Sequence, residues 1–537
     1  MFDRKTLKEY FMRFDINKLC FTVSVILFAF MYFSVLRFIL STGISLLNSD
    51  ASSEMVMAAQ LNREGSFLTS KNWFYSTEFR VIHTPQLIFR IALAIFPHNW
   101  HWARLLSVAM FLLILTGCII WLMYAMGHGQ YAFWAAIAII APFGQWYGWF
   151  VIFNSFYVPH ITISIISLAL MCEITRSYNN SHSVKRAVYI SLLLVLGFMS
   201  GLDGVRQLMI CYVPILAVSI ILLYLKETQI ISITFPAKFL FFISFFLCIF
   251  SGIGCLINSA YLSKHYHFKT FTNICWLPFS LDNYISCISV FISLFGWQGK
   301  IPILSLAGIV NVLSLLLVGT ILWSTIYLVI KIKSLTVNET LLTLFFCMAF
   351  LVDLLIYGGT QQYNGGYWTT ILPFAFVPLF IMLPKIVPSP TKKSILLASY
   401  GLLLFLSSYL TMKSPYIENV RTDISIQNVS NWLNESDYTQ GIASFWNSNI
   451  ITELSNGNIE MWTITGEDDE TLTPRPWLQS VEHETLPTGK VFLLLTYTEF
   501  HDMDIPGVLE EYIVYVDDDY IVYDFDDISQ YFELINE

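Results

Sequence analysis

Charge is the scarcest property of this 537-residue sequence, because only 12% of its residues are Asp, Glu, Lys or Arg, against about 25% in an ordinary soluble domain. Lys and Arg together number 29 and Asp and Glu 38, so the basic surplus of a simple nucleic-acid-binding protein is missing. Hydrophobic residues make up 56% of the chain and aromatic residues 16%. This composition excludes a soluble globular enzyme, a disordered protein and a fibrous protein, and it indicates a polytopic membrane protein.

Cysteine is missing from the end of the chain, since all nine cysteines precede Thr411. The C-terminal part is therefore no disulfide scaffold. Cys275 and Cys287 lie in one predicted outer loop and could pair, although two free thiols are the simpler interpretation. Nowhere in the sequence do His, Cys and carboxylate residues cluster with the spacing of zinc ligands.

Charge is also divided unevenly along the chain. The part from Thr411 onward has 4 basic and 25 acidic residues, whereas the part before it has 25 basic and 13 acidic residues. This division predicts a transmembrane domain over residues 1–411 and an acidic, water-soluble domain over residues 412–537.

Apolar runs in the first part predict about 11 transmembrane helices, since a bilayer-spanning helix needs about 20 mostly apolar residues. The predicted spans are 19–41, 102–126, 131–149, 155–175, 187–201, 208–225, 236–257, 302–331, 340–358, 367–384 and 393–411. With a cytoplasmic N-terminus, 15 Lys and Arg residues fall on the inside and 8 on the outer loops before the tail. The positive-inside rule therefore predicts an extracytoplasmic tail.

The first outer loop, residues 42–101, is too long to be a simple connector. It contains two amphipathic stretches, 53–61 and 84–96, that are too short to span a bilayer and are typical of interfacial helices. The tail predicts an α/β domain, with strands at 441–446, 459–464 and 490–497, a helix at 447–455 and a hairpin at 511–525.

Two carboxylates follow the first predicted span directly. Asp50 and Glu54 are four residues apart, so a helix opened by Ser49 or Asp50 would place both near one face at its positive end. A helix cap with a first-turn acid would explain the same residues without any function. Polar and aromatic residues crowd the loop that follows. They are Asn72, Trp73, Tyr75, Ser76, Thr77, Glu78, Arg80 and His83.

An acidic pair after the first span, in a long outer loop with two interfacial helices, resembles the GT-C class of membrane glycosyltransferases. That class includes protein mannosyltransferases, aminoarabinose transferases and oligosaccharyltransferases, and many members carry an α/β domain after the last span. The stretches 72–78 and 444–449 are also similar to uncharacterised bacterial proteins of this type. The sequence departs from oligosaccharyltransferases because it has no convincing acceptor motif of the Trp-Trp-Asp type.

The resemblance implies transfer of a sugar, with inversion, from a polyprenyl-phosphate donor to a cell-envelope acceptor outside the cytoplasm. Asp50 would be the general base, assisted by Glu54. The donor phosphate needs a cation, for which Arg206 in a glycine-bearing outer turn and Arg80 are the candidates. Arg206 could instead pair with Asp203 or reach lipid headgroups.

Further candidates for the substrate pocket are Trp73, Tyr75, Glu78, His83, the intramembrane Asp353, and Tyr363 and Asn364 of a glycine-rich outer turn. We assign no metal site, although a divalent cation at Asp50 and Glu54 would suit the chemistry; metal-free members of the class exist.

The expected partners are a lipid-linked sugar, membrane lipids and a polysaccharide, glycolipid or protein acceptor, without nucleic acid, in a bacterial plasma membrane. The alternatives are a transporter or flippase of lipid-linked sugars, or a non-catalytic scaffold presenting the tail. The sequence has no visible inverted repeat of the kind found in transporters.

Overall fold

The structure, a computed structural model, describes residues 16–76, 86–179, 183–231, 237–269, 275–361, 364–413, 424–465, 472–502 and 507–536. Within these ranges, nine helices are long and apolar enough to cross a bilayer, which makes the chain a multi-pass membrane protein. They are α2 (Ile16–Thr42), α5 (Trp100–Met126), α8 (Val158–Asn179), α9 (Ser183–Leu202), α10 (Val213–Glu227) with the π-helical turn η4 (Leu208–Tyr212) before it, α11 (Ala237–Ala260), α13 (Leu306–Ile330), α14 (Val337–Thr360) and α18 (Pro390–Lys413).

Two of the eleven predicted spans, 131–149 and 367–384, are wrong as continuous helices. The first is divided into α6 (Ala132–Ile140), α7 (Gly144–Tyr147) and the π-helical η3 (Gly148–Phe153), and the second into α15 (Gly365–Trp368), α16 (Leu372–Ala375) and α17 (Val377–Ile386). Proline explains both, because it lacks the amide hydrogen that continues a helix. Ala141, just before Pro142, adopts an extended conformation, and Pro373 and Pro378 lie at the starts of α16 and α17.

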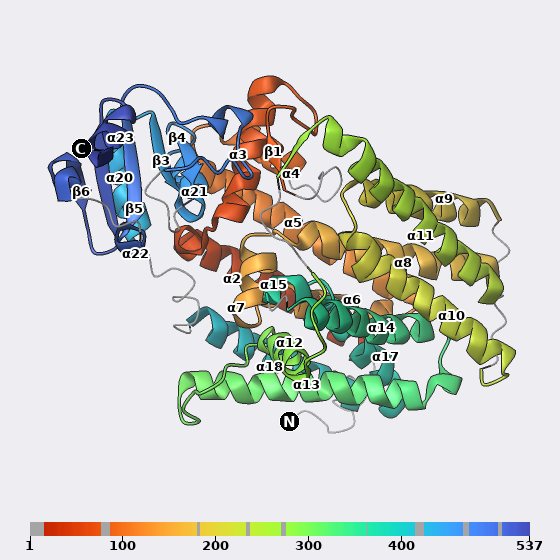
Figure 1. Ribbon diagram of the computed structural model, residues 1–537. Coiled ribbons are helices and arrows are strands. Elements are labelled where there is room, and N and C mark those ends of the chain that lie inside the picture. The colour runs from red at the N-terminus through yellow and green to blue at the C-terminus, as the bar shows by residue number, and fades with distance from the viewer. Residues whose placement is uncertain are drawn as a thin grey trace, which may run out of the picture.

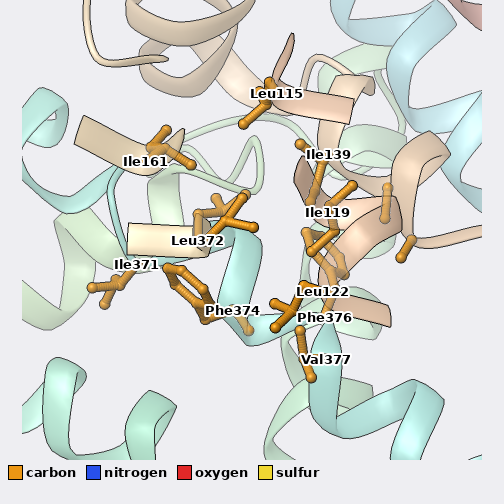
Figure 2. Packing of buried hydrophobic residues seen from close by; sticks show 14 of the residues in the cluster. Leu115, Ile119, Leu122, Ile139, Ile161, Ile371, Leu372, Phe374, Phe376 and Val377 are labelled. Atoms are coloured by element: carbon orange, nitrogen blue, oxygen red, sulfur yellow. The ribbon is translucent and has the colours of Figure 1, made fainter. Parts of the chain in front are cut away.

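The broken segments are buried inside the helical bundle. Figure 2 shows the side chains of Leu372, Phe374 and Phe376 close to those of α5 and α6, and all three are at most 2% exposed. Irregular backbone at membrane depth is tolerated where protein surrounds it. These segments therefore form the centre of the core, and the long helices enclose them.

The first outer loop folds into η1 (Gly43–Leu46), α3 (Ser49–Glu64), β1 (Phe74–Tyr75) and α4 (Gln86–Ile95), so both predicted amphipathic stretches are helical. Neither Ser49 nor Asp50 is the cap of α3. The cap is Asn48, whose side-chain oxygen accepts a 3.0 Å hydrogen bond from the backbone N–H of Ala51. The helix ends at Gly65, which has the positive φ of 67° typical of helix C-termini.

The tail is an α/β domain, as predicted, built on a five-stranded sheet in the order β4-β3-β5-β7-β6. The strands β3, β4 and β5 are parallel, whereas β7 runs antiparallel to both of its neighbours, β5 and β6. The strands are β3 (Gln440–Ser444), β4 (Glu460–Ile464), β5 (Val491–Thr496), β6 (Ile513–Val516) and β7 (Tyr520–Phe525). The tail helices are α20 (Ile424–Glu435), α21 (Phe445–Leu454), η7 (Val481–Glu484), α22 (Tyr497–Asp502), η8 (Gly507–Tyr512) and α23 (Ser529–Asn536).

The tail packs against the first outer loop at one end of the bundle, where α21 (blue) lies beside α3 (red-orange) in Figure 1. The Phe74 amide donates to the Gln479 carbonyl at 2.8 Å, and the Val481 amide donates to the Asn72 carbonyl at 3.0 Å. On its other side, β1 pairs in parallel with β2 (His267–Phe268) of the second outer segment. Three distant segments thus form one small outer sheet, which fixes α3 between the bundle and the tail.

The second outer segment also contains η5 (Leu262–Lys264) and α12 (Leu281–Ser293). The short 3-10 helices η2 (Gly129–Tyr131) and η6 (Ile332–Ser334) lie between longer helices of the bundle. Cys275 and Cys287, which the sequence allowed to pair, are both free thiols.

Candidate functional site

The first two turns of α3 carry the two predicted catalytic carboxylates. Asp50 is the second residue of the helix and is half-buried, whereas Glu54, one turn later, is only 4% exposed. Residues four apart share a helix face. Asp50 lies at the positive end of the helix dipole.

Tyr157 immediately precedes α8, and the charges of both Asp50 and Arg206 affect its phenol. Burial raises the pKa of the Tyr157 phenol to about 12. The positive charge of Arg206 and the hydrogen bond that it donates act in the opposite direction, while the negative charge of Asp50 adds to the increase in pKa. Both predicted charges therefore lie within electrostatic reach of one phenol.

Arg206 lies between two tyrosine rings. Its guanidinium carbon is 5.5 Å from the ring centroid of Tyr157 and 5.5 Å from that of Tyr367, which is within cation–π range. Tyr367 lies on α15 and stacks on Tyr357 of α14, with ring centroids 5.5 Å apart. The guanidinium is thus near two aromatic rings, and Arg206 is half-buried.

Asn364 of the glycine-rich turn has a local structural role. Its side-chain oxygen accepts a 2.8 Å hydrogen bond from the Gly366 amide and so caps α15, the helix that carries Tyr367. Arg80, Glu78, His83 and Tyr363 lie outside the described residues. The turn therefore contributes to the surroundings of Arg206 through Tyr367, a residue that the sequence analysis did not single out.

Trp73 and Tyr75 pack against the second half of α3, at Met57 and Leu61, rather than against its first turn. Trp73 is 1% exposed and bridges to Ser480 of the tail, in the small outer sheet. The aromatic residues Trp73 and Tyr75 thus belong to the contact between the first outer loop and the tail.

Asp353 is a fully buried carboxylate on α14, one helical turn before Tyr357. Neither of its oxygens has a hydrogen-bond partner in the part of the chain that the structure describes. Such a group inside a membrane bundle is costly and usually functional. The structure places it next to the tyrosine cluster rather than next to Asp50.

A buried ion pair that sequence reasoning missed fixes the backbone beside Asp50. The guanidinium of Arg104, near the start of α5, pairs with Glu453 of α21, and their side chains are 6% and 3% exposed. Arg104 Nη2 also donates a 3.1 Å hydrogen bond to the carbonyl of Ala51. In the sequence, Arg104 is visible only as a basic residue near the start of the predicted span 102–126, and its partner lies in the distant tail.

An apolar groove opens beside the turn that precedes Arg206. It has a volume of about 680 Å³ and is lined by Gly204 and Val205 of that turn and by one face of α11, including Ile253 and Leu256. The last two side chains are 43% and 66% exposed. The groove is thus largely apolar and adjoins the turn that leads to Arg206, although Arg206 itself does not line it.

No group of three or more His, Cys, Asp or Glu side chains among the described residues could hold a metal ion. The acidic pair on α3 would therefore supply at most two of the protein ligands of a cation there. We assign no metal to the site.

No protein-family model matches the sequence, and no curated protein matches it. Among solved structures, ArnT from Cupriavidus metallidurans bound to undecaprenyl phosphate is similar, with a TM-score of 0.57 and 11% identity over 93% of this chain and 97% of that one. The Archaeoglobus fulgidus oligosaccharyltransferase in complex with zinc and sulfate has a TM-score of 0.45 and 12% identity, over 80% of this chain and 62% of that one.

The similarity to ArnT extends over the helical bundle and the tail. At 11% identity, the likeness concerns the fold. ArnT is a GT-C membrane glycosyltransferase. The chain thus has the ArnT-like fold of the GT-C membrane glycosyltransferases, as the sequence resemblance predicted.

Proposed function

We propose that this protein transfers a sugar from a polyprenyl-phosphate donor to an acceptor hydroxyl on the outer side of the membrane. The observation that carries the proposal is the convergence of Asp50 and Arg206 on Tyr157, because these residues come from distant parts of the chain. The ArnT-like fold supports it, since that ArnT structure is bound to undecaprenyl phosphate.

The reaction needs a general base for the acceptor hydroxyl and a cationic group that stabilises the negative charge of the leaving phosphate. The acceptor hydroxyl attacks the anomeric carbon of the donor sugar while the bond from that carbon to the phosphate oxygen breaks, which inverts the anomeric configuration. Asp50 takes the proton of the attacking hydroxyl, and Glu54 helps to orient this carboxylate. Arg206 stabilises the negative charge that develops on the leaving lipid phosphate.

The groove beside Arg206 fits the rest of the donor. A polyprenyl chain is a hydrocarbon, and the exposed aliphatic side chains of α11 offer it a lipid-facing surface. A donor lying there would place its phosphate at Arg206 without burying a charge in the bilayer. The same location gives the acceptor access to Asp50 from the aqueous side.

The loop charges favour a cytoplasmic N-terminus and an extracytoplasmic tail. In this orientation α3, Arg206 and the tail are on the outer side, where a cell-envelope polysaccharide, glycolipid or protein would be the acceptor. We place the protein in a bacterial plasma membrane.

Replacement of Asp50 by Asn tests the proposal. The cap of α3 is Asn48, so Asp50→Asn leaves the helix start intact and removes only the proton acceptor. Turnover should fall by about 10²–10⁴-fold, and Glu54→Gln should lower it less. The measurement is release of sugar or of lipid phosphate from a panel of undecaprenyl-phosphate sugars by protein in nanodiscs.

A matched control is Asp282→Asn, because Asp282 is also an acid in the first turn of an outer helix, α12, but is exposed. This variant should keep wild-type turnover. A well-folded Asp50→Asn protein with full activity would remove Asp50 as the base and, with it, the main support for glycosyl transfer.

A further inference from the structure

A second cavity, of about 190 Å³, lies between the first outer loop and the tail. The indole side chains of Trp73 and Trp100 line it, together with the amides of Gln60 on α3 and Asn449 on α21. Glu460 and His483 of the tail also line the cavity. Aromatic and amide side chains together are typical of sites that orient a polar ring.

Two of these amides each have one atom without a hydrogen-bond partner in the described part of the chain: Gln60 Oε1 and Asn449 Nδ2. Gln60 is 6% exposed and Asn449 is 1% exposed, so both residues are more than nine-tenths buried. An unpaired buried polar atom costs free energy unless something occupies the site.

The contacts around the two amides determine their orientation. Gln60 Nε2 donates to Glu64 Oε1 and to the Asn72 carbonyl, each at 2.9 Å, so its oxygen is the atom left over. Asn449 Oδ1 faces the donor Gln479 Nε2 at 3.5 Å, which leaves the Asn449 nitrogen. The cavity therefore has one unused acceptor and one unused donor, which is the complement of hydroxyl groups that both donate and accept.

Three titratable side chains among the described residues line the cavity: Glu460 and His483, which are paired with each other, and Arg63, which is exposed. His483 Nε2 is 3.1 Å from Glu460 Oε1, and this hydrogen bond lowers the pKa of Glu460 against the effect of its burial. Nδ1 of the same histidine contacts Gln479 Oε1 at 2.9 Å. Besides this histidine, the lining that the structure describes has one positive charge, Arg63, and one negative charge, Glu460, so it has no excess charge that would favour an ionic ligand. The cavity therefore favours an uncharged ligand rich in hydroxyl groups.

The size and position of the cavity restrict the ligand further. Pockets for drug-sized molecules start at about 300 Å³, so 190 Å³ holds a single ring. Gln60 and Asp50 lie on the same helix, ten residues or roughly 15 Å apart at 1.5 Å per residue. A ligand that reaches both must therefore be longer than one sugar ring.

We propose that this cavity binds one ring of a neutral saccharide acceptor, whose far end reaches Asp50. That the bound saccharide is the acceptor rests on the proposed function. That the ligand is a saccharide rests on the geometry of the cavity. Gln60 and Asn449 hydrogen-bond to hydroxyl groups of the ring, and the indole of Trp100 packs against its apolar face.

The test is direct binding of oligosaccharides by the full-length protein in nanodiscs, without donor. The probes are an array of hexose, N-acetylhexosamine, 6-deoxyhexose and pentose oligomers, followed by titration of those that bind. Asn449→Leu should weaken binding by roughly tenfold. This change removes an unpaired donor and only one long hydrogen bond, so the variant should fold.

Gln60→Leu is a second variant with the same expected effect. Gln427→Leu is the matched control, since Gln427 lines a separate cavity between α20, α21 and the bundle. Equal binding by Asn449→Leu, by Gln60→Leu and by the wild type would overturn the site, as would an array on which the wild type binds no neutral oligosaccharide.

The two proposals fail in distinguishable ways. Asp50→Asn should still bind the oligosaccharides that the wild type binds, because Asn keeps the shape of Asp and the cavity that holds the ring is unchanged. If the wild type binds them but cleaves no lipid-linked sugar in the presence of bound oligosaccharide, glycosyl transfer is refuted and the saccharide site stands. If donor is cleaved but Asn449→Leu leaves binding unchanged, only the saccharide site is refuted.

Discussion

The ion pair between Arg104 and Glu453 gives a prediction with a definite magnitude. In Arg104→Met the carboxylate of Glu453, 3% exposed, loses its partner. Removal of one member of a buried pair costs about 3–5 kcal/mol. The Ala51 carbonyl also loses the 3.1 Å hydrogen bond from Arg104, which adds about 1 kcal/mol. We therefore expect a free energy of unfolding lower by about 4–6 kcal/mol.

Glu453→Leu should destabilise the protein by a comparable amount, because it leaves the guanidinium uncompensated. The double variant Arg104→Met/Glu453→Leu should recover most of the lost stability, since apolar replacement of a whole buried pair is often neutral. Denaturant titration in mixed micelles measures all four proteins, and the double-mutant cycle gives the interaction energy.

Measurements of turnover distinguish the role of Arg104 in positioning Ala51 from its role in stability. In the double variant the fold is restored, but nothing replaces the hydrogen bond that holds Ala51, next to Asp50. Turnover should therefore stay below that of the wild type while the apparent donor affinity is unchanged. Single variants that each lose less than about 1 kcal/mol, or a double variant that loses the sum of both, would refute the reasoning.

Three further predictions follow from the charges. Arg206→Ala should weaken undecaprenyl-phosphate binding by about 1.5–3 kcal/mol, and Arg206→Lys should recover part of the loss because Lys lacks the planar fork; unchanged affinity in the Ala variant would contradict the phosphate role. Reporter fusions after Lys393 and after Lys413 should report cytoplasm and exterior, and a shared compartment would contradict the topology. The hydrogen bond from His483 lowers the pKa of Glu460 in the folded state, so its stabilisation is present above the unfolded pKa of about 4.3 and is lost as the pH falls through the lower folded value. Glu460→Gln should abolish that part of the pH dependence of thermal unfolding, and an unchanged acid profile would contradict it.

Hydrophobicity and local capping made much of this fold predictable. Nine long spans follow from apolar runs, and α3 from its amphipathic pattern. The breaks at Pro142 and Pro373 were missed, although both prolines are visible in the sequence, because the total hydrophobicity of the two segments suffices for a continuous span. A count of apolar residues does not reveal that one proline lacks the amide hydrogen needed to continue a helix.

Charges were easier to place than their partners. Asp50 was singled out as the first carboxylate after the first span, and Arg206 because it lies in a glycine-bearing outer turn; both charges affect the pKa of the Tyr157 phenol. Tyr157 was not foreseeable, since nothing local distinguishes it among 28 tyrosines. Arg104 had no visible partner because Glu453 approaches it only when the tail docks.

The small outer sheet has a consequence for biogenesis. β1 pairs with the segment at 479–481, which is synthesised roughly 400 residues later, or about 20–80 s at 5–20 residues per second. Until then, the backbone groups of Phe74 and Asn72 that bond to the tail have to be satisfied by water or by another chain. The helix α3 therefore reaches its final surroundings only after the tail has been synthesised and has docked. A chain whose synthesis stops before the tail therefore lacks the contacts that place α3, and it exposes the edge of β1 that the tail would cover.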